Sequence, residues 1–171
     1  MGLNISRSEL LSGDISGRSR PIRPPWSLPE MAFRSTCNSC GNCLEKCPTR
    51  IIEFGRGRIP VIDFNHGECV FCGECTRSCE TGALHQSLDQ APWHITAVID
   101  NKKCLAYQNV ECRSCQDPCE NRAIRFLALA GNISKPDLDA EQCSGCGACF
   151  SVCPANAISI SSNIIENNNG Y

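Results

Sequence analysis

The sixteen cysteines among the 171 residues are the side chains best able to carry chemistry. They form four groups of four, and no cysteine is left over. Three groups share the spacing C-x2-C-x2-C-x3-C: Cys37, Cys40, Cys43 and Cys47; Cys69, Cys72, Cys75 and Cys79; and Cys143, Cys146, Cys149 and Cys153. The remaining group, Cys104, Cys112, Cys115 and Cys119, keeps the later gaps but has seven residues in its first gap.

This spacing predicts [4Fe-4S] clusters, because two-residue gaps let three thiolates converge on one compact cluster while the fourth reaches the other cluster of a two-cluster unit. The sixteen cysteines are therefore the candidate metal ligands, and four clusters are expected. Structural zinc and a disulfide framework are the alternatives, but zinc sites usually join two separated cysteine pairs. No catalytic residue is expected, since no cysteine is spare and His66, His85 and His94 stand singly.

If the fourth cysteine of each group crosses to the partner cluster, four ligand sets follow. Site one would use Cys37, Cys40, Cys43 and Cys79, and site two Cys69, Cys72, Cys75 and Cys47. Site three would use Cys104, Cys112, Cys115 and Cys153, and site four Cys143, Cys146, Cys149 and Cys119. Because Cys104 must reach its site across the long gap, a [3Fe-4S] cluster or an incomplete site is the alternative at site three.

The composition indicates that disulfides or metal stabilise the fold in addition to side-chain packing. The 42% hydrophobic content includes the cysteines, so aliphatic and aromatic side chains for an ordinary core are few. The sequence has no run of 18 apolar residues, so no membrane span is expected. No apolar segment follows Arg7, Arg18, Arg20 and Arg23, so the cytoplasm is expected, where thiols stay reduced. A net charge of −2 argues against nucleic-acid binding.

The sequence predicts an α+β fold: two tandem bacterial dicluster ferredoxin-like units, with short hairpin strands and short helices around iron–sulfur clusters. The expected divisions are a basic, flexible N-terminal arm (1–30), the first unit (31–90), a linker and the second unit (91–162), and a frayed tail (163–171). Expected hairpins join Ile51–Phe54 to Ile59–Phe64 and Ile124–Ala130 to Ile133–Leu138, and residues 91–99 are a linker or a closing strand. A short helical turn is expected after the last cysteine of each group.

Two segments resemble the NapF family of ferredoxin-type accessory proteins, which are encoded with periplasmic nitrate reductases. They are Ile22-Arg-Pro-Pro-Trp-Ser27 and the stretch from Cys104 to Glu120, which contains the seven-residue gap. The resemblance covers about residues 20–160. Sequences of that family often have paired arginines near the N-terminus, whereas this chain has Arg7-Ser8, so targeting by an arginine pair is not expected.

The resemblance implies a cytoplasmic iron–sulfur protein that is not an enzyme. Its implied partner is the catalytic molybdenum subunit of periplasmic nitrate reductase, a NapA-like protein, in its precursor form. The implied role is to assemble that subunit's own cluster, or to hold it in a suitable redox state, before export. The cysteine spacing alone supports electron transfer or cluster donation, so a polyferredoxin electron carrier, or an electron-transfer subunit of a redox complex, is the alternative.

Overall fold

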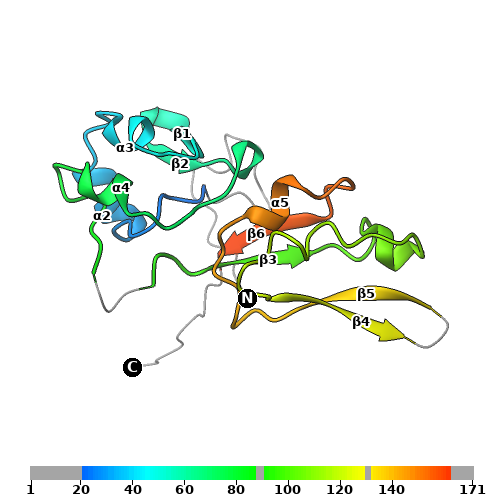
Figure 1. The fold of residues 1–171 in the computed structure, drawn as a ribbon. Helices are drawn as coiled ribbons and strands as arrows, with labels where there is room; N and C mark the ends of the chain where they lie inside the picture. The colour runs from blue at the N-terminus through cyan, green and yellow to red at the C-terminus, as the bar shows by residue number, and fades with distance from the viewer. Residues whose placement is uncertain (1–20, 88–90, 130–131, 163–171) are drawn as a thin grey trace, which may run out of the picture.

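The computed structural model describes residues 21–87, 91–129 and 132–162. Within them, short elements form two groups that lie next to one another (Figure 1). The expected tail of residues 163–171 and the first twenty residues of the expected arm lie outside the described residues.

Among its described residues, the first unit has three short α-helices, a small hairpin and two 3-10 helices (Figure 1). The helices are α2 (Glu30–Thr36), α3 (Asn42–Glu45) and α4 (Glu74–Arg77). Strands β1 (Ile52–Phe54) and β2 (Pro60–Ile62) are antiparallel, with Ile52 opposite Ile62. The 3-10 helices η1 (Arg56–Arg58) and η2 (Phe64–His66) follow β1 and β2, respectively.

The second unit has two pairs of antiparallel strands. Strand β3 (Ile95–Ile99) pairs with β6 (Ile158–Ser162), so the unit's first strand lies beside its last. Strand β4 (Ile124–Leu129) pairs with β5 (Asn132–Leu138), with a register irregularity between Leu127 and Leu129. The 3-10 helix η3 (Leu105–Gln108) and helix α5 (Ala148–Ser151) complete the unit.

Both expected hairpins are confirmed by the β1–β2 and β4–β5 pairings. The segment 91–99 ends in a closing strand, since β3 pairs with β6. The expected position of the helical turns is wrong: α3, α4 and α5 each come before the last cysteine of their group. After the last cysteine of each group the chain instead makes a turn. The residue three positions after that cysteine has a positive φ, a conformation that ends a helix; these residues are Arg50, Gly82, Arg122 and Asn156.

The segment from Ile22 to Glu30 packs on the first unit, which differs from the expected flexible arm over these residues. The carbonyl of Ile22 accepts a hydrogen bond from the backbone N–H of Ile62 at 2.8 Å. Trp26 is 8% exposed, and its carbonyl accepts from the N–H of His85 at 2.9 Å. The Arg23 guanidinium donates to both carboxylate oxygens of Glu30, at 2.8 and 2.7 Å, and so fixes this segment to the start of α2.

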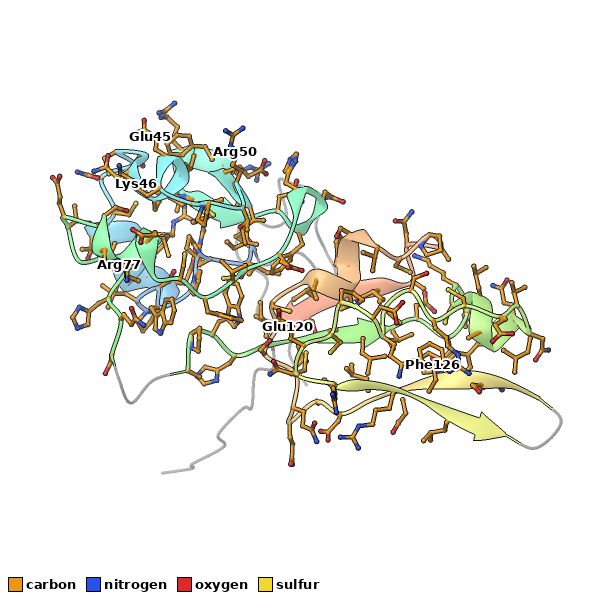
Figure 2. The ribbon with its side chains drawn as sticks, in the orientation of Figure 1. Glu45, Lys46, Arg50, Arg77, Glu120 and Phe126 are labelled. Carbon is orange, nitrogen blue, oxygen red and sulfur yellow. The ribbon has the colours of Figure 1, made fainter. Side chains whose placement is uncertain are left out.

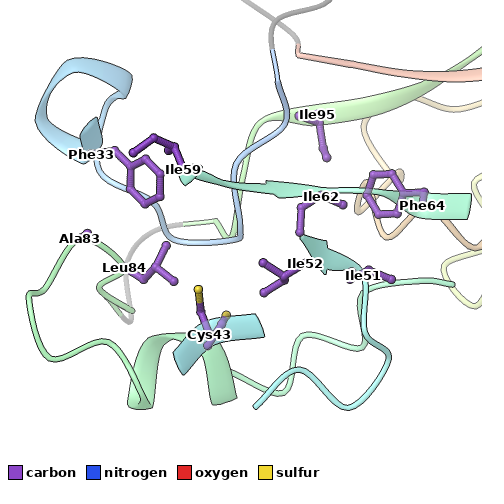
Figure 3. Packing of buried hydrophobic residues seen from close by; sticks show 11 residues of the cluster. Phe33, Cys43, Ile51, Ile52, Ile59, Ile62, Phe64, Ala83, Leu84 and Ile95 are labelled. Atoms are coloured by element: carbon purple, nitrogen blue, oxygen red, sulfur yellow. The ribbon is translucent and has the colours of Figure 1, made fainter. Parts of the chain in front are cut away.

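Each unit has a small buried core that includes cysteines. In the first unit, Cys43 points into the same space as Leu84 and Ile52 (Figure 3), and Cys75 belongs to the same buried cluster. Among the described residues, the buried cluster of the second unit is smaller, and its members are Ala97, Cys115, Ile124, Cys149 and Ile158, with partly buried side chains around them. The third cysteine of each group thus occupies a core position.

Candidate metal centres

Two cavities in the first unit are lined by cysteines. One has an empty volume of about 320 Å³, and its cysteines are Cys37, Cys40, Cys43 and Cys79. The other has an empty volume of about 340 Å³, and its cysteines are Cys47, Cys69, Cys72 and Cys75. Each cavity therefore takes three cysteines from one group and the last cysteine of the other group.

The remaining walls of these cavities are largely apolar. Phe33 and Leu84 line the first, whereas Trp26, Ile51 and Phe71 line the second. Apolar walls exclude water from a site, which strengthens the electrostatic interactions of any charged group bound there.

In the second unit, the buried third cysteine of each group interacts with the other three thiols of its expected set, and Cys149 also interacts with Cys115 of the other set. Burial is the main cause that raises the pKa of Cys115 to about 11, and the nearby thiolates of Cys104, Cys112 and Cys153 raise it further. Burial likewise raises the pKa of Cys149 to about 12, with additions from Cys146, Cys143, Cys115 and Cys119. The structure thus brings Cys104 to Cys115 despite the long gap in the sequence.

The buried thiols of the first unit have similarly high pKa values. Burial raises the pKa of Cys43 to about 12, followed by the effects of Cys75, Cys37, Cys40 and Cys79. It also raises the pKa of Cys69 to about 12 and that of Cys75 to about 11. Thiols with such pKa values carry a proton at neutral pH, so metal binding must release it.

The spacing of the sulfur atoms does not fit a four-cysteine zinc site. Tetrahedral zinc with bonds of about 2.3 Å holds its sulfur atoms about 3.8 Å apart. Among the described residues, one group of three potential ligands has all its ligand atoms within 4.8 Å of one another. It consists of Glu53, Asp63 and His66, and contains no cysteine. The cysteine sets are wider than a zinc ion needs, and four thiolates around a cavity fit a larger iron–sulfur cluster.

Glycines shape three of the four cysteine loops. Gly41, Gly73 and Gly147 each lie two residues before the third cysteine of a group, with φ of +90°, +74° and +84°, and each begins one of the helices α3, α4 and α5. This left-handed conformation is available to glycine without the steric cost that a side chain brings. In the group of Cys104, Arg113 takes this position, and no α-helix forms there.

The seven-residue gap of that group folds into a compact loop around η3. Its turn is closed by hydrogen bonds from the N–H groups of Tyr107 and Gln108 to the carbonyl of Cys104, at 3.1 and 3.2 Å. Ala106 is completely buried, and the N–H of Val110 returns to the carbonyl of Leu105 at 2.9 Å. The additional residues therefore form a loop that brings Cys112 back towards Cys104.

Several groups near the sulfur atoms were not found from the sequence. The N–H groups of Leu84 and Ala157 donate to Sγ of Cys79 and Cys153, each at 3.3 Å. The hydroxyls of Thr49 and Thr81 lie 3.6 Å from Sγ of Cys47 and Cys79, respectively. The repeated threonine two residues after the last cysteine was the available signal. Hydrogen bonds to ligand sulfur atoms help to set reduction potentials.

The exposed cysteines belong to the first unit. Cys40 and Cys72 are exposed, whereas every cysteine of the second unit is half-buried or buried. Arg77 donates a hydrogen bond to the carbonyl of Cys72 at 2.6 Å, and also pairs with Glu74. Figure 2 shows Lys46, Arg50 and Arg77 around the outside of the first unit, so these cations lie near the surface of the cysteine loops.

No helix in the described parts of the chain is long and apolar enough to cross a membrane.

Comparison with known proteins assigns the cysteine loops to a family. The 4Fe-4S dicluster domain family matches residues 36–83 and 110–157. These ranges contain every cysteine except Cys104, which lies ahead of the second match. The chain therefore has two tandem 4Fe-4S dicluster domains, and its cofactors are [4Fe-4S] clusters.

Similarity extends over most of the chain to named proteins. The ferredoxin-type protein NapF of Escherichia coli K12 is 39% identical over 158 residues, which cover 92% of this chain and 95% of the relative. The ferredoxin-type protein NapF of Haemophilus influenzae is 41% identical over 139 residues, covering 81% and 78%. The methylamine utilization ferredoxin-type protein MauM of Methylobacillus flagellatus is 32% identical over 158 residues, covering 80% and 68%.

Proposed function

The chain belongs to the NapF family of ferredoxin-type iron–sulfur proteins, and from that premise we propose that it is a cytoplasmic accessory factor for a periplasmic nitrate reductase. Its partner would be the precursor of the catalytic molybdenum subunit, a NapA-like protein. Its task would be to assist assembly of that subunit's own cluster, or to hold the cluster in a suitable redox state, before export. The observation that carries the proposal is the 39% identity to NapF along 92% of the chain.

The proposed ligands are the sixteen cysteines, in the four sets expected from the crossover of the last cysteine. The two cavities of the first unit and the interactions among the thiols of the second support these sets. A bound [4Fe-4S] cluster supplies reversible uptake of a single electron. The protein's own part is to position four thiolates, surround them with apolar side chains and direct backbone N–H groups at the sulfur atoms.

Iron analysis of anaerobically purified protein tests the ligand sets. A complete chain is expected to hold about sixteen irons, four at each site. Cys104→Ala and Cys153→Ala are each expected to lower the iron content by about four per chain, and the double variant by no more, because both residues are assigned to site three. A loss of about eight irons in the double variant would contradict the assignment.

Binding to the reductase tests the partner. Purified holoprotein is mixed with the molybdenum subunit in its precursor form and, separately, in its mature exported form. We expect it to retain the precursor and to release the mature enzyme, with residues 1–20 deleted in a parallel sample to measure the contribution of that segment. Equal binding of both forms, or of neither, would overturn the accessory role.

An electron carrier of a redox complex is the second candidate. It is favoured by the similarity to MauM, which is named for methylamine utilization, and by the exposure of Cys40 and Cys72 at the surface. A strain that lacks this chain separates the two roles. An accessory factor leaves the reductase with a deficient cluster when it is deleted, whereas loss of a carrier leaves the cluster intact and slows electron flow to the enzyme.

A further inference from the structure

A backbone hydrogen bond joins the cysteine loops of the two units. The N–H of Cys69 donates to the carbonyl of Cys146 at 2.8 Å. Cys69 belongs to the proposed site two, and Cys146 belongs to the proposed site four. Two ligand residues from different units are thus directly connected, although 77 positions separate them in the sequence.

Aromatic side chains surround this connection. Phe64, at the start of η2, packs edge-on against Trp93 with ring centroids 6.0 Å apart, and its centroid lies 6.4 Å from that of Phe150 in α5. Phe71, which lies between the site-two ligands Cys69 and Cys72, packs against Trp93 from another direction at 5.7 Å. The indole N–H of Trp93 donates to the carbonyl of Ser144 at 2.8 Å. Residues from both units therefore enclose the contact.

Gly147 allows this close approach, and Gly145 allows the chain beside it to pack against β3 of its own unit. A Cβ atom built on Gly147 would lie 2.1 Å from Cδ1 of Phe64, and one on Gly145 would lie 2.5 Å from the carbonyl oxygen of Ile95. Neither space could hold a methyl group without movement of its neighbours. At Gly41, which has the same position in its group as Gly147, the nearest atom is Phe54 Cζ at 3.4 Å, an ordinary contact. The tight fit is thus a property of the interface and not of the repeated motif.

Within each unit, the sites are connected differently. Cys43 of site one and Cys75 of site two lie in one buried cluster, and Cys115 of site three and Cys149 of site four lie in the other. The buried third cysteines therefore link site one to site two, and site three to site four. Together with the hydrogen bond between Cys69 and Cys146, these contacts place the sites in the spatial order one, two, four, three.

We propose that the hydrogen bond between Cys69 and Cys146, held by Phe64, Trp93 and Gly147, is the electronic connection between the two dicluster units. Sites two and four are then the inner pair, and sites one and three are the ends of the series. With clusters bound, each passage would move one electron from a reduced site to an oxidised one and would need no further reactant. This inference rests on the proposed ligand sets, but not on the identity of the partner.

The order of the sites can be tested with variants that keep the ligands of two sites and lose those of the other two. The inner-pair variant carries Cys37→Ala, Cys40→Ala, Cys104→Ala and Cys112→Ala, and so keeps complete ligand sets at sites two and four. The outer-pair variant carries Cys69→Ala, Cys72→Ala, Cys143→Ala and Cys146→Ala, and keeps sites one and three. Both variants are expected to hold about eight irons per chain.

Electron paramagnetic resonance of the dithionite-reduced proteins provides the readout, because spin–spin interaction falls steeply with distance. We expect signals split by interaction in the inner-pair variant, and the sum of two isolated signals in the outer-pair variant. Isolated signals from an inner-pair variant with its full iron, or equal splitting in both variants, would overturn the proposal.

A second measurement keeps all sixteen cysteines. Gly147→Ala adds a methyl group against Phe64, while Gly41→Ala adds one at the matching position of site one, with the same backbone conformation and more space. We expect the interaction features of the reduced spectrum to weaken in Gly147→Ala and to persist in Gly41→Ala at equal iron content. Identical spectra would overturn the positioning role of Gly147. Failure to bind the reductase precursor would instead count against the proposed function, and would leave these spectra unchanged.

Discussion

The contact between Phe64 and Gly147 allows a quantitative prediction about stability. Adding a methyl group at Gly147 places carbon 2.1 Å from Cδ1 of Phe64, so the ring must retreat by about 1.3 Å to reach an ordinary contact of 3.4 Å. Phe64 is 4% exposed and is packed against Trp93 and Phe150, so it has little room to move. Overpacking of this kind costs about 1–3 kcal/mol.

The backbone conformation adds a second cost that can be separated from the first. A residue with a side chain in the left-handed region costs about 1–2 kcal/mol. Gly147 has φ of +84° and Gly41 has φ of +90°, so Gly41→Ala should pay a similar conformational cost without the clash. The difference in the free energy of unfolding between the two variants is therefore predicted to be about 1–3 kcal/mol, with Gly147→Ala the less stable.

Thermal unfolding of the anaerobic holoprotein, followed by far-ultraviolet circular dichroism at one heating rate, measures this difference. For a chain of this size it corresponds to an apparent midpoint about 3–10 °C lower for Gly147→Ala than for Gly41→Ala. In the double variant with Phe64→Ala, the added methyl group meets no ring, so Gly147→Ala should then cost no more than Gly41→Ala does. Equal midpoints for the two glycine variants in the native background would refute the reasoning.

Thr49→Val should lower the reduction potential of site two by about 40 mV in a potentiometric titration, if the hydroxyl 3.6 Å from Cys47 Sγ contributes a hydrogen bond worth about 1 kcal/mol. Thr76→Val is the control, because the Thr76 hydroxyl donates to the carbonyl of Gly73. Equal potentials in the two variants would count against a hydrogen bond from Thr49 to Cys47. Arg122→Gly should be more stable to heat than Arg122→Ala by about 1 kcal/mol, because Arg122 is exposed and has φ of +51°; no gain over alanine would contradict this. After iron is chelated, amides of β4 and β5 should exchange hydrogen faster than those of β1 and β2, because among the described residues fewer side chains are buried in the second unit. Equal exchange in the two hairpins would contradict this difference.

The local features of the fold could be predicted because their causes are local. Apolar segments on either side of Gly55 and Gly57 give the β1–β2 hairpin, and the segments around residues 130–132 give β4–β5. The spacing within each cysteine group limits which thiols can converge, so the four groups are evident from the sequence alone. The crossover sets rest on a known property of two-cluster units, and the cavities of the first unit gather cysteines in the same combinations.

Features that depend on distant residues could not be predicted. Strand β3 pairs with β6 across more than fifty residues, and neither segment contains a signal that selects the other. Ile22–Ser27 packs on the first unit through the buried ring of Trp26 and through backbone hydrogen bonds to residues that are distant in the sequence. The helices were expected in the wrong place because positive φ at residues such as Arg50 and Arg122, which rarely adopt it, is set by the fold and not by residue type.

The repeated glycines show why a motif alone does not reveal its role. Gly41, Gly73 and Gly147 have the same place in their groups and the same handedness of backbone, but they face different neighbours. A side chain at Gly41 would meet Phe54, one at Gly73 would meet the end of Gln86, and one at Gly147 would meet the packed ring of Phe64. All three glycines serve to begin a helix at a cysteine loop, and only the last also lets the two units touch. Since the cysteine loops themselves form that interface, we expect a substitution there to change the stability of the protein and the separation of its metal sites together.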